Sequence, residues 1–461
     1  MAARECSTAA AKMTSMIVDH RDIGAAFRRL SLPLAVQMIG DQLLGIVDTI
    51  AIGSLGAVAL AGATAATTVM LALAFAIYGF MNGLGIIAAQ RVGANDLAGY
   101  AKTVRAGFVI PFVCAVVCAI ASIPFAGFII GEMIGHLPSA HASALYLIIR
   151  CFSMIPMTVS AALIVGLGAA GNRVLGVSLL AVVNVVHIPL LLILGLGFLT
   201  HHPFGIVGAG ISSLLSETIA AIYGIVYVYR RPIYRIFEEL TIDLRLAFEC
   251  ARLGLPEAVF LFAVIAPDSF IVAMLAPLGA IAISAFRALN VVSDLTFAVP
   301  SPMQAAVQTV IGQRLGAGDV EGARWFFTRS RLFSFWFTTL TGVGTAVLAW
   351  PLAYLFTLNP VVASAAAWPL ALQMATLPIK GWAMVSMAPI RAAGDTRFSM
   401  TVGIVSSVLV IPLSYAFIKV LHIGLLGVPI AWVIAWLARL LLTMLKLRDD
   451  SWTRRKLLTS S

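Results

Sequence analysis

A seven-residue stretch that occurs twice constrains the fold of this chain more than any other feature. It reads QRVGAND from residue 90 and QRLGAGD from residue 313. In the register that aligns these two copies, Leu32-Pro33 falls on Leu255-Pro256, and Gly99 falls on Gly322. Because this repeat register holds over the block without a gap, the chain consists of two related halves.

Each copy of the stretch lies between a long apolar run and a basic run. Its glycines allow the backbone to turn sharply. We therefore expect both copies to form turns at a face of a membrane. The residues that define these turns are Gln90, Gly93 and Asp96 in the first half, and Gln313, Gly316 and Asp319 in the second.

The composition places the chain in a membrane. Hydrophobic residues make up 61% of it and charged residues 11%, and the mean hydropathy is +1.01. A soluble protein of this composition would lack the polar surface needed to cover itself. The five cysteines have neither the spacing of metal ligands nor a secreted disulfide pattern.

Twelve stretches are long and apolar enough to span a bilayer, which takes roughly 20 residues. They begin near residues 31, 60, 104, 140, 175, 205, 254, 281, 332, 363, 399 and 424. We predict an all-α membrane protein with twelve transmembrane helices in two six-helix halves. An even number of spans per half relates the halves by a pseudo-two-fold axis along the membrane normal, with a cavity between them. The expected segments are 1–30, a cytoplasmic N-terminal segment; 31–229, the first half; 230–253, a cytoplasmic linker; 254–446, the second half; and 447–461, a basic cytoplasmic tail.

Lys and Arg are distributed unevenly among the connections. The outer connections are nearly free of them, whereas the alternate ones are rich, as at Arg230, Arg231 and Arg235 between the halves. By the positive-inside rule both termini are cytoplasmic, and the chain lies in the inner or plasma membrane. The net charge of +10 then reflects topology and contact with anionic membrane lipid. No nucleic-acid-binding fold accompanies it, and residues 1–30 lack the apolar core of a signal peptide.

Motifs for enzymatic chemistry are absent from the sequence. None of the six lysines follows a glycine, so there is no P-loop, and there is no HExxH motif. The seven histidines are scattered rather than clustered with acids. We expect no enzyme activity and no cofactor. The simplest interpretation of parallel repeats without a nucleotide site is a monomeric secondary transporter that moves a small-molecule substrate.

Several separated motifs make the chain similar to the multidrug and toxic compound extrusion (MATE) transporters, and the likeness covers nearly the whole chain. These motifs are QLLGIVDT from residue 42, GSLG from residue 53, Leu289-Asn290 with Phe297 and Pro300, the turn at 313–319, and AAGDT from residue 392. The resemblance implies export of amphipathic, usually cationic, compounds in exchange for protons or sodium.

A charge inside a membrane span is costly and is a functional candidate by default. Asp268 lies about 18 Å from the start of span seven, and Lys380 lies about 16 Å above Arg391, at about 1.5 Å of rise per residue. Because the two share a depth, we expect them to form an ion pair. The resemblance to NorM-type members places sodium ligands at Val264 and Lys380, so both ligands are absent here, and the alternative is that Lys380 permanently replaces the cation.

Span eight carries three polar residues on one face. Arg287, Asn290 and Asp294 are spaced i, i+3 and i+7. Together with Asp268 and Lys380 they give the second half two carboxylates and two cations. We expect these five residues to line the substrate cavity.

The first half has an excess of acids. Glu217 lies about 18 Å from the outer end of span six, and Arg150 about 14 Å from that of span four, so the two can pair. Asp41 and Asp48 then remain on one face of span one without a cation. Burial without a partner favours a protonated carboxyl, so we predict that Asp48, with Asp41, carries the coupling proton. The alternative for Asp41 is a hydrogen bond to a neighbouring helix.

Span five resembles part of the N-x-x-x-D-P pattern of DinF-type members. Asn184 and Pro189 match its Asn and Pro, so the resemblance places Asn184 at the cation-coupling site. The aspartate of that pattern is Ile188 here, and His187 lies beside it. The sequence leaves His187 open as either a packed polar residue or a proton relay.

Two other functions stay open at this point. One is a lipid-linked precursor flippase of the same superfamily, which would be expected to have extra spans and a more cationic cavity. The other is an exporter of one specific metabolite. The sequence identifies neither the substrate nor the coupling ion, H⁺ or Na⁺.

Overall fold

The computed structural model describes residues 23–135, 139–198, 204–239, 241–263 and 266–454. All regular secondary structure in these ranges is helical. Val264 and the chain beyond Arg454 lie outside them.

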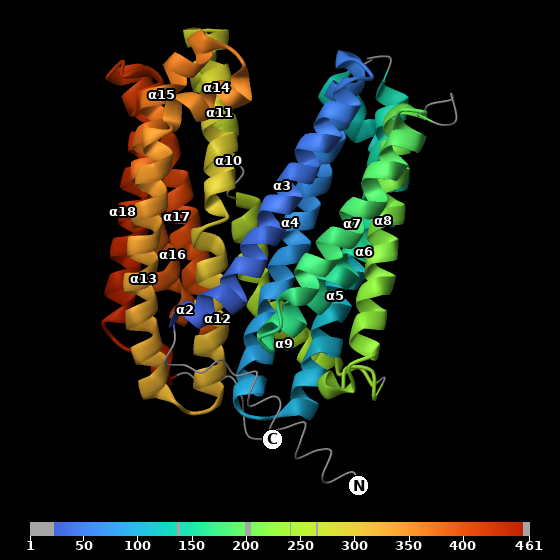
Figure 1. Cartoon of the computed structure of the whole chain (residues 1–461), viewed down its shortest axis with the longest axis vertical. Coiled ribbons are helices and arrows are strands. Elements are labelled where there is room, and N and C mark those ends of the chain that lie inside the picture. Colours follow the sequence, from blue (N-terminus) through green and yellow to red (C-terminus); the bar gives the residue numbers. More distant parts are fainter. Residues whose placement is uncertain (1–22, 136–138, 199–203, 240, 264–265, 455–461) are drawn as a thin grey trace. The chain divides into compact units, whose positions relative to one another are not determined.

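The first half is built from long, continuous helices, coloured blue to green in Figure 1. After the short α2 (Ile23–Ala26) and the π-helical η1 (Phe27–Ser31), they are α3 (Leu32–Gly53), α4 (Ala57–Gly93), α5 (Leu97–Ile134), α6 (Ala140–Ala169), α7 (Val174–Leu190) with the π-helical η2 (Leu191–Gly195), and α8 (Gly205–Tyr229). A 3-10 turn, η3 (Pro232–Tyr234), follows α8.

The second half contains more and shorter helices, coloured yellow to red in Figure 1. They are α9 (Leu244–Ala263), α10 (Ala266–Leu275), η4 (Ala276–Leu278), α11 (Ala280–Phe297), α12 (Pro300–Gly316), α13 (Val320–Val347), α14 (Ala349–Thr357), α15 (Pro360–Ala375), α16 (Leu377–Ala392), α17 (Thr396–Tyr415), η5 (Ala416–Val420), η6 (Gly424–Leu426), α18 (Gly427–Leu447) and α19 (Ser451–Arg454).

The helices agree with the predicted number of spans. Within the described residues, ten helical segments are long and apolar enough to cross a membrane, and α13 with α14, bent by 65° at their junction, makes an eleventh. The remaining predicted span, near residue 254, corresponds to α9 and α10, which are separated by residues 264–265. The twelve-helix, all-α prediction is therefore consistent with the structure.

The chain divides into two compact units that exchange their first segments. Of the described residues, one unit takes those within 36–258, and the other takes those within 259–454 together with residues 23–35. Phe27 stacks on Phe333, with ring centroids 4.7 Å apart, so η1 packs in the second unit. Residues 244–253, expected in the linker, form the first turns of α9 and belong to the first unit.

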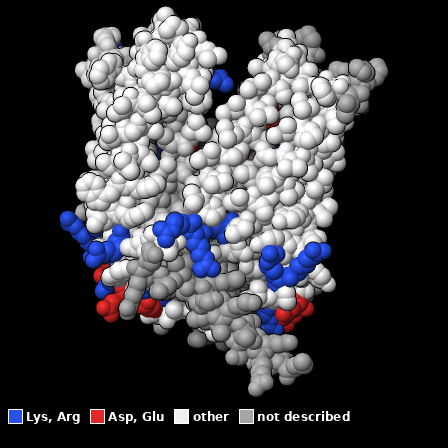
Figure 2. Space-filling view, in the orientation of Figure 1, with Lys and Arg blue, Asp and Glu red and all other residues white. Residues whose placement is uncertain are grey.

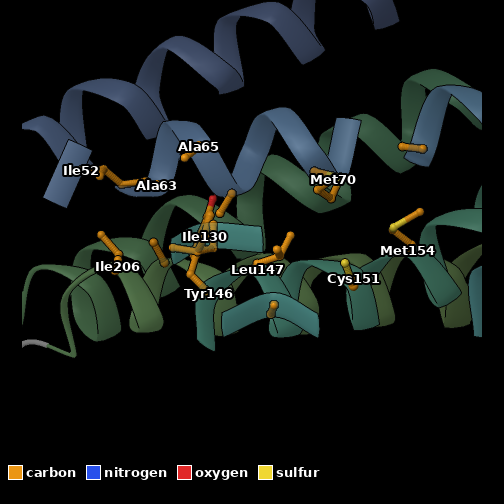
Figure 3. Packing of buried hydrophobic residues seen from close by; sticks show 14 of the residues in the cluster. Ile52, Ala63, Ala65, Met70, Ile130, Tyr146, Leu147, Cys151, Met154 and Ile206 are labelled. Carbon is orange, nitrogen blue, oxygen red and sulfur yellow. The ribbon is translucent and has the colours of Figure 1, made fainter. Parts of the chain in front are cut away.

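The apolar core of the first unit joins α4, α5, α6 and α8. Figure 3 shows Met70 of α4 and Ile130 of α5 facing Tyr146 and Leu147 of α6, with Ile206 of α8 beside them. All five side chains are buried. This packing fixes α4, α6 and α8, which carry functional side chains described below.

Helix α9 approaches α4 so closely that only glycine fits between their backbones. A Cβ atom at Gly83 would meet the carbonyl oxygen of Cys250, and one at Gly79 would meet the backbone of Ala258. At the start of α9, Asp243 Oδ1 accepts the Leu246 N–H at 3.1 Å, and Lys102 Nζ lies 2.9 Å from Asp243 Oδ2. The Lys102 side chain and this backbone N–H hold the pKa of Asp243 below its usual value.

Charged side chains gather at one end of the helices in each unit. Figure 2 shows nearly all visible Lys and Arg there, while most of the remaining surface carries no charge. Within each unit, this distribution is typical of helices whose apolar flanks face lipid and whose basic ends lie at a membrane face.

Candidate functional site: a charged cluster in each half

Six ionisable side chains come together in the first half, and we call them the first-half cluster. They are supplied by five helices: Asp41 and Asp48 by α3, Tyr78 by α4, Arg150 by α6, His187 by α7 and Glu217 by α8.

The strongest contact in this cluster joins Asp48 to His187. Asp48 Oδ1 lies 2.7 Å from His187 Nε2. The histidine side chain is 3% exposed, whereas the aspartate side chain is 27% exposed. The expectation that Asp48 has no partner was therefore wrong. It counted Lys and Arg alone as partners for the acids, and a histidine one residue before the missing Asp position supplies the partner instead.

The remaining acids of the cluster interact through their charges. The charge of Arg150 acts on Glu217, as expected, and so does that of His187. No ion pair within 4.0 Å forms between Glu217 and Arg150 in the described structure. Asp41 feels the charge of Glu217, so two carboxyl groups repel one another at this place. The hydroxyl of Tyr78 feels Glu217, Asp41 and Arg150 together.

The charge balance of the first-half cluster is negative when His187 is neutral. It contains three carboxyl groups, Asp41, Asp48 and Glu217, and one permanent cation, Arg150. Two like charges that share a site cannot both ionise cheaply. The cluster can therefore hold protons, and a cation that enters it would favour their release.

Asn184 lies one turn before His187 on α7 but engages its own helix. Its Nδ2 donates to the carbonyl oxygen of Leu180 at 2.8 Å. The structure thus places Asn184 on the same helix as the histidine of the cluster, with its amide nitrogen directed at the backbone.

The second half has a different cluster, in which cations lie against aromatic rings. We define the second-half cluster as Asp268 of α10, Asp294 and Phe297 of α11, Lys380 of α16, and Trp436 and Arg439 of α18. Such cation–π contacts stabilise a cation that has left water.

Lys380 lies between two rings and faces an acid of α11. Its Nζ is 4.7 Å from the centroid of the Phe297 ring and 5.7 Å from that of Trp436. Among the described residues, the carboxylate whose charge acts on Lys380 is Asp294, although no ion pair within 4.0 Å forms between the two. The predicted ion pair of Lys380 with Asp268 is wrong, because helix rise gives depth but not the direction in which a side chain points. Asp268 feels Asp294 instead.

The other two residues expected in this cavity lie on the same helix. Arg287 is exposed and Asn290 is partly buried on α11. Neither makes a side-chain hydrogen bond or ion pair with another part of the described chain.

Arg439 belongs to this cluster and was not predicted from the sequence. It is 7% exposed, and its guanidinium lies 5.0 Å from the Trp436 ring and 5.3 Å from the Phe260 ring. The rule that flags charges inside apolar spans would have found it.

The second-half cluster lies where helices break. Helix α11 ends at Phe297 and α12 begins at Pro300, whose missing N–H suits the first position of a helix. Helix α15 ends at Ala375, and α16 begins at Leu377, so Lys380 lies in the first turn of α16 and its N–H bonds to the Thr376 carbonyl at 3.2 Å. Interrupted helices of this kind surround substrate sites in many transporters.

Both copies of the repeated stretch form the same turn. Asp96 accepts the Gly99 N–H at 2.8 Å and the Arg91 guanidinium at 2.5 Å. The second copy repeats these bonds at 2.8 Å and 2.6 Å: Asp319 caps Gly322 and pairs with Arg314. Gln90 and Gln313 are both buried, and Gly93 and Gly316 end helices α4 and α12.

Comparisons with known proteins identify the family. The sequence pattern of the MatE family matches residues 33–193 and again residues 256–416. The two matches stand in the same repeat register that places residue 90 on residue 313.

Curated relatives match over most of their length. Multidrug resistance protein MdtK of Yersinia pseudotuberculosis is 23% identical over 396 residues, 84% of this chain and 84% of that protein. Probable multidrug resistance protein NorM of Aromatoleum aromaticum is 24% identical over 349 residues, 74% of each.

Solved structures share the fold. A MOP superfamily transporter from Pyrococcus furiosus, described as having a binding pocket of reversed polarity, has a TM-score of 0.86 at 19% identity and covers 94% of this chain and 97% of that one. The Vibrio cholerae MATE transporter VcmN has a TM-score of 0.82 at 18% identity, covering 97% and 100%. Because the MatE pattern covers well over half of its residues, this chain is a multi-pass membrane protein of the MatE family, whose members are transporters and not enzymes.

Proposed function

We propose that this chain exports amphipathic, cationic small molecules in exchange for protons by alternating access. The observation that carries the proposal is the Asp48–His187 pair, 2.7 Å apart, within a cluster of three carboxyl groups and one arginine. Relatives named multidrug resistance proteins support efflux of several compounds.

The chemistry of exchange follows from the charge of the first-half cluster. When protons neutralise Asp48 and Asp41, the cluster has little attraction for a cation. When the protons leave, the negative charge attracts a cationic substrate, so the two ligands exclude one another. Exchange further requires that the proton be held more tightly in the outward-facing state than in the inward-facing state, because equal affinity would shift no equilibrium.

The proposal also includes the orientation of the protein in the membrane, its oligomeric state and its coupling ion. The basic ends of the helices support cytoplasmic termini in the inner or plasma membrane. The proposed transporter is a monomer. Sodium is the alternative coupling ion.

A transport assay on the purified protein in proteoliposomes tests this function. A cationic dye would be followed under a proton gradient alone and under a sodium gradient alone. We expect transport with the proton gradient, and we expect Asp48→Asn to abolish it at equal membrane abundance.

The matched control is Glu132→Gln, which removes an exposed acid at the far end of α5, outside the cluster. It should transport like the wild type. Transport driven by sodium alone, or full proton-driven transport by Asp48→Asn, would contradict the proposal.

One observation favours a narrower substrate range as a second candidate. Lys380 and Arg439 lie on aromatic rings in the second half, a setting that suits a substrate with an anionic group as well as a cation. An exporter of one zwitterionic metabolite would transport that compound and not a panel of cationic dyes. The same proteoliposomes distinguish the two functions.

A further inference from the structure

A cavity at the basic end of the second half has no part in the proposed exchange. Its volume is about 560 Å³, and it lies between the start of α13 and the end of α18, with the C-terminal turn as its third wall. The residues that give it its character are Arg324, Phe327 and Arg331 of α13, and Arg448, Asp450 and Trp452 of the C-terminal segment.

The cavity carries an excess of positive charge. Asp450, the one carboxylate among the described lining residues, is engaged by Arg324, with Nη2 2.7 Å from Oδ2. Arg331 and Arg448 form no ion pair with the described part of the chain. Two guanidinium charges are therefore left for a ligand.

Arg331 is held in place by apolar contacts instead of by an acid. Its guanidinium lies 5.1 Å from the Trp382 ring and 5.4 Å from the Phe327 ring, and Nη1 lies 3.7 Å from Met444 Sδ. These contacts come from α16, α13 and α18, so the side chain bridges the groove between α13 and α18. An arginine fixed in this way keeps its donors in a rigid fork that suits a phosphate.

The C-terminal segment lines one side of this open cavity and is itself anchored. Trp452 is 5% exposed and packs edge-on against Phe327, with ring centroids 6.2 Å apart. The cavity wall is therefore a built part of the second unit.

An apolar path leads from the cavity along the outside of the bundle. Leu441, Leu445 and Arg448 are spaced i, i+4 and i+7, so they share one face of α18. Leu441 is 60% exposed and Leu445 is 49% exposed, which places apolar surface where lipid tails run. A ligand with a phosphate at one end and alkyl chains at the other would match both parts.

We propose that this cavity binds the headgroup of an anionic glycerophospholipid, with its phosphate between Arg331 and Arg448 and its acyl chains along Leu441 and Leu445. Basic pockets between transmembrane helices at the basic membrane face bind such headgroups in other membrane proteins. A free phosphate would use the arginines alone and would have no use for the apolar path.

The matching positions of α5 in the first half lack two of these arginines. In the repeat register, Arg331 falls on Phe108 and Arg324 falls on Ala101. The arginines that α13 contributes to the site are thus particular to the second half. The site also does not depend on which ion or substrate the protein transports.

Binding of lipid to the purified full-length protein tests the proposal. Phosphatidylglycerol and phosphatidylcholine would be titrated separately in detergent and counted by native mass spectrometry. We expect tight binding of phosphatidylglycerol only, and a loss of affinity of about 30-fold in Arg331→Gln/Arg448→Gln, from roughly fivefold per cation removed near the membrane surface.

Two further variants keep the test decisive. Arg448→Gln alone changes an exposed side chain, cannot disturb the packing of Arg331, and should lose about fivefold. Arg245→Gln removes an equally interfacial arginine that pairs with Glu249 at 3.6 Å in the first unit, and it should bind like the wild type.

Three results would overturn the proposal. They are equal binding of phosphatidylcholine, unchanged phosphatidylglycerol binding in Arg331→Gln/Arg448→Gln, and displacement of the lipid by millimolar inorganic phosphate. The last would show a site for a soluble anion.

Discussion

The two halves descend from one sequence pattern but build their helices differently. In the first half α4 runs unbroken for 37 residues, whereas the matching part of the second half is divided into α11 and α12. The division falls at Pro300, which the repeat register aligns with Ile77 inside α4. In the first half the charged side chains therefore lie on continuous helices. In the second half they lie near places where a helix is interrupted.

Proline alone does not explain the difference. Helix α5 contains Pro111 and Pro124, and α6 contains Pro156, yet all three positions lie inside continuous helices. At the α15–α16 junction the Thr376 hydroxyl donates to the Gln373 carbonyl at 2.7 Å, while Gln373 Nε2 donates to Ser293 of α11 at 2.9 Å. Side-chain bonds that satisfy freed backbone groups let a break persist where a proline begins it.

The largest effect on the free energy of unfolding is expected when one charged side chain is removed from the second-half cluster. Lys380→Gln should lower the free energy of unfolding by about 2 kcal/mol, somewhat less than the loss of one partner from a fully buried pair. Adding Asp294→Asn should recover most of this loss, because it removes the carboxylate that faces Lys380. Thermal unfolding in detergent measures each variant.

Lys380→Gln/Asp268→Asn is the control for this cycle, and it should recover less. If Asp268→Asn recovered more of the free energy of unfolding than Asp294→Asn, the ion pair of Lys380 with Asp268 would be supported instead. The same cycle on Arg150 and Glu217 would show whether the first half, with its excess of acids, responds as strongly.

An intermediate effect is expected where α9 meets α4 in the first unit. Gly83→Ala would ordinarily stabilise a helix by about 1 kcal/mol. Here the Cys250 carbonyl occupies the space, so we expect destabilisation by about 1–2 kcal/mol from overpacking. The second half carries Ala306 at this register, which shows that the requirement belongs to the first half alone.

Gly127→Ala provides the matched control, because a Cβ atom there meets nothing within 4 Å. It should raise the melting temperature while Gly83→Ala lowers it. If both variants shifted the melting temperature in the same direction, the close approach of α4 and α9 would not be what requires glycine at residue 83.

The smallest effect concerns the turns, where the halves should behave alike. Asp96→Ala and Asp319→Ala each remove a helix cap and an arginine partner, so each should cost about 1 kcal/mol of stability. The two costs should add in the double variant, because the sites share no partner. If only one of the two variants lost stability in the same unfolding assay, the repeated turn would have no stabilising role in the other half.

The repeat and the number of spans could be read from the sequence because both depend on patterns along the chain. The turn residues from Gln90 to Asp96 are an example, since a capping aspartate and its glycine are neighbours in sequence. The position of Asp41 and Asp48 on α3 could likewise be read from the sequence, because both residues lie in one apolar stretch.

The partners inside the membrane could not be predicted in this way. Depth along a helix follows from residue count, but the choice of Asp294 over Asp268 for Lys380 depends on how each helix is rotated. The partner of His187 is also hidden in the sequence, because its contact with Asp48 joins residues 139 positions apart. The break before Pro300 likewise needed the hydrogen bonds of neighbouring helices.

The exchange of first segments sets an order for assembly during synthesis. Residues 23–30 are made early but pack with Met303 and Phe326, which are made after the entire first half. The first unit in turn is not complete until the chain has reached residue 258. The second unit takes segments from both sides of the first, and the first unit takes residues 244–258 from beyond the linker. A gene cut between the halves would therefore leave each product without a segment that the other one holds.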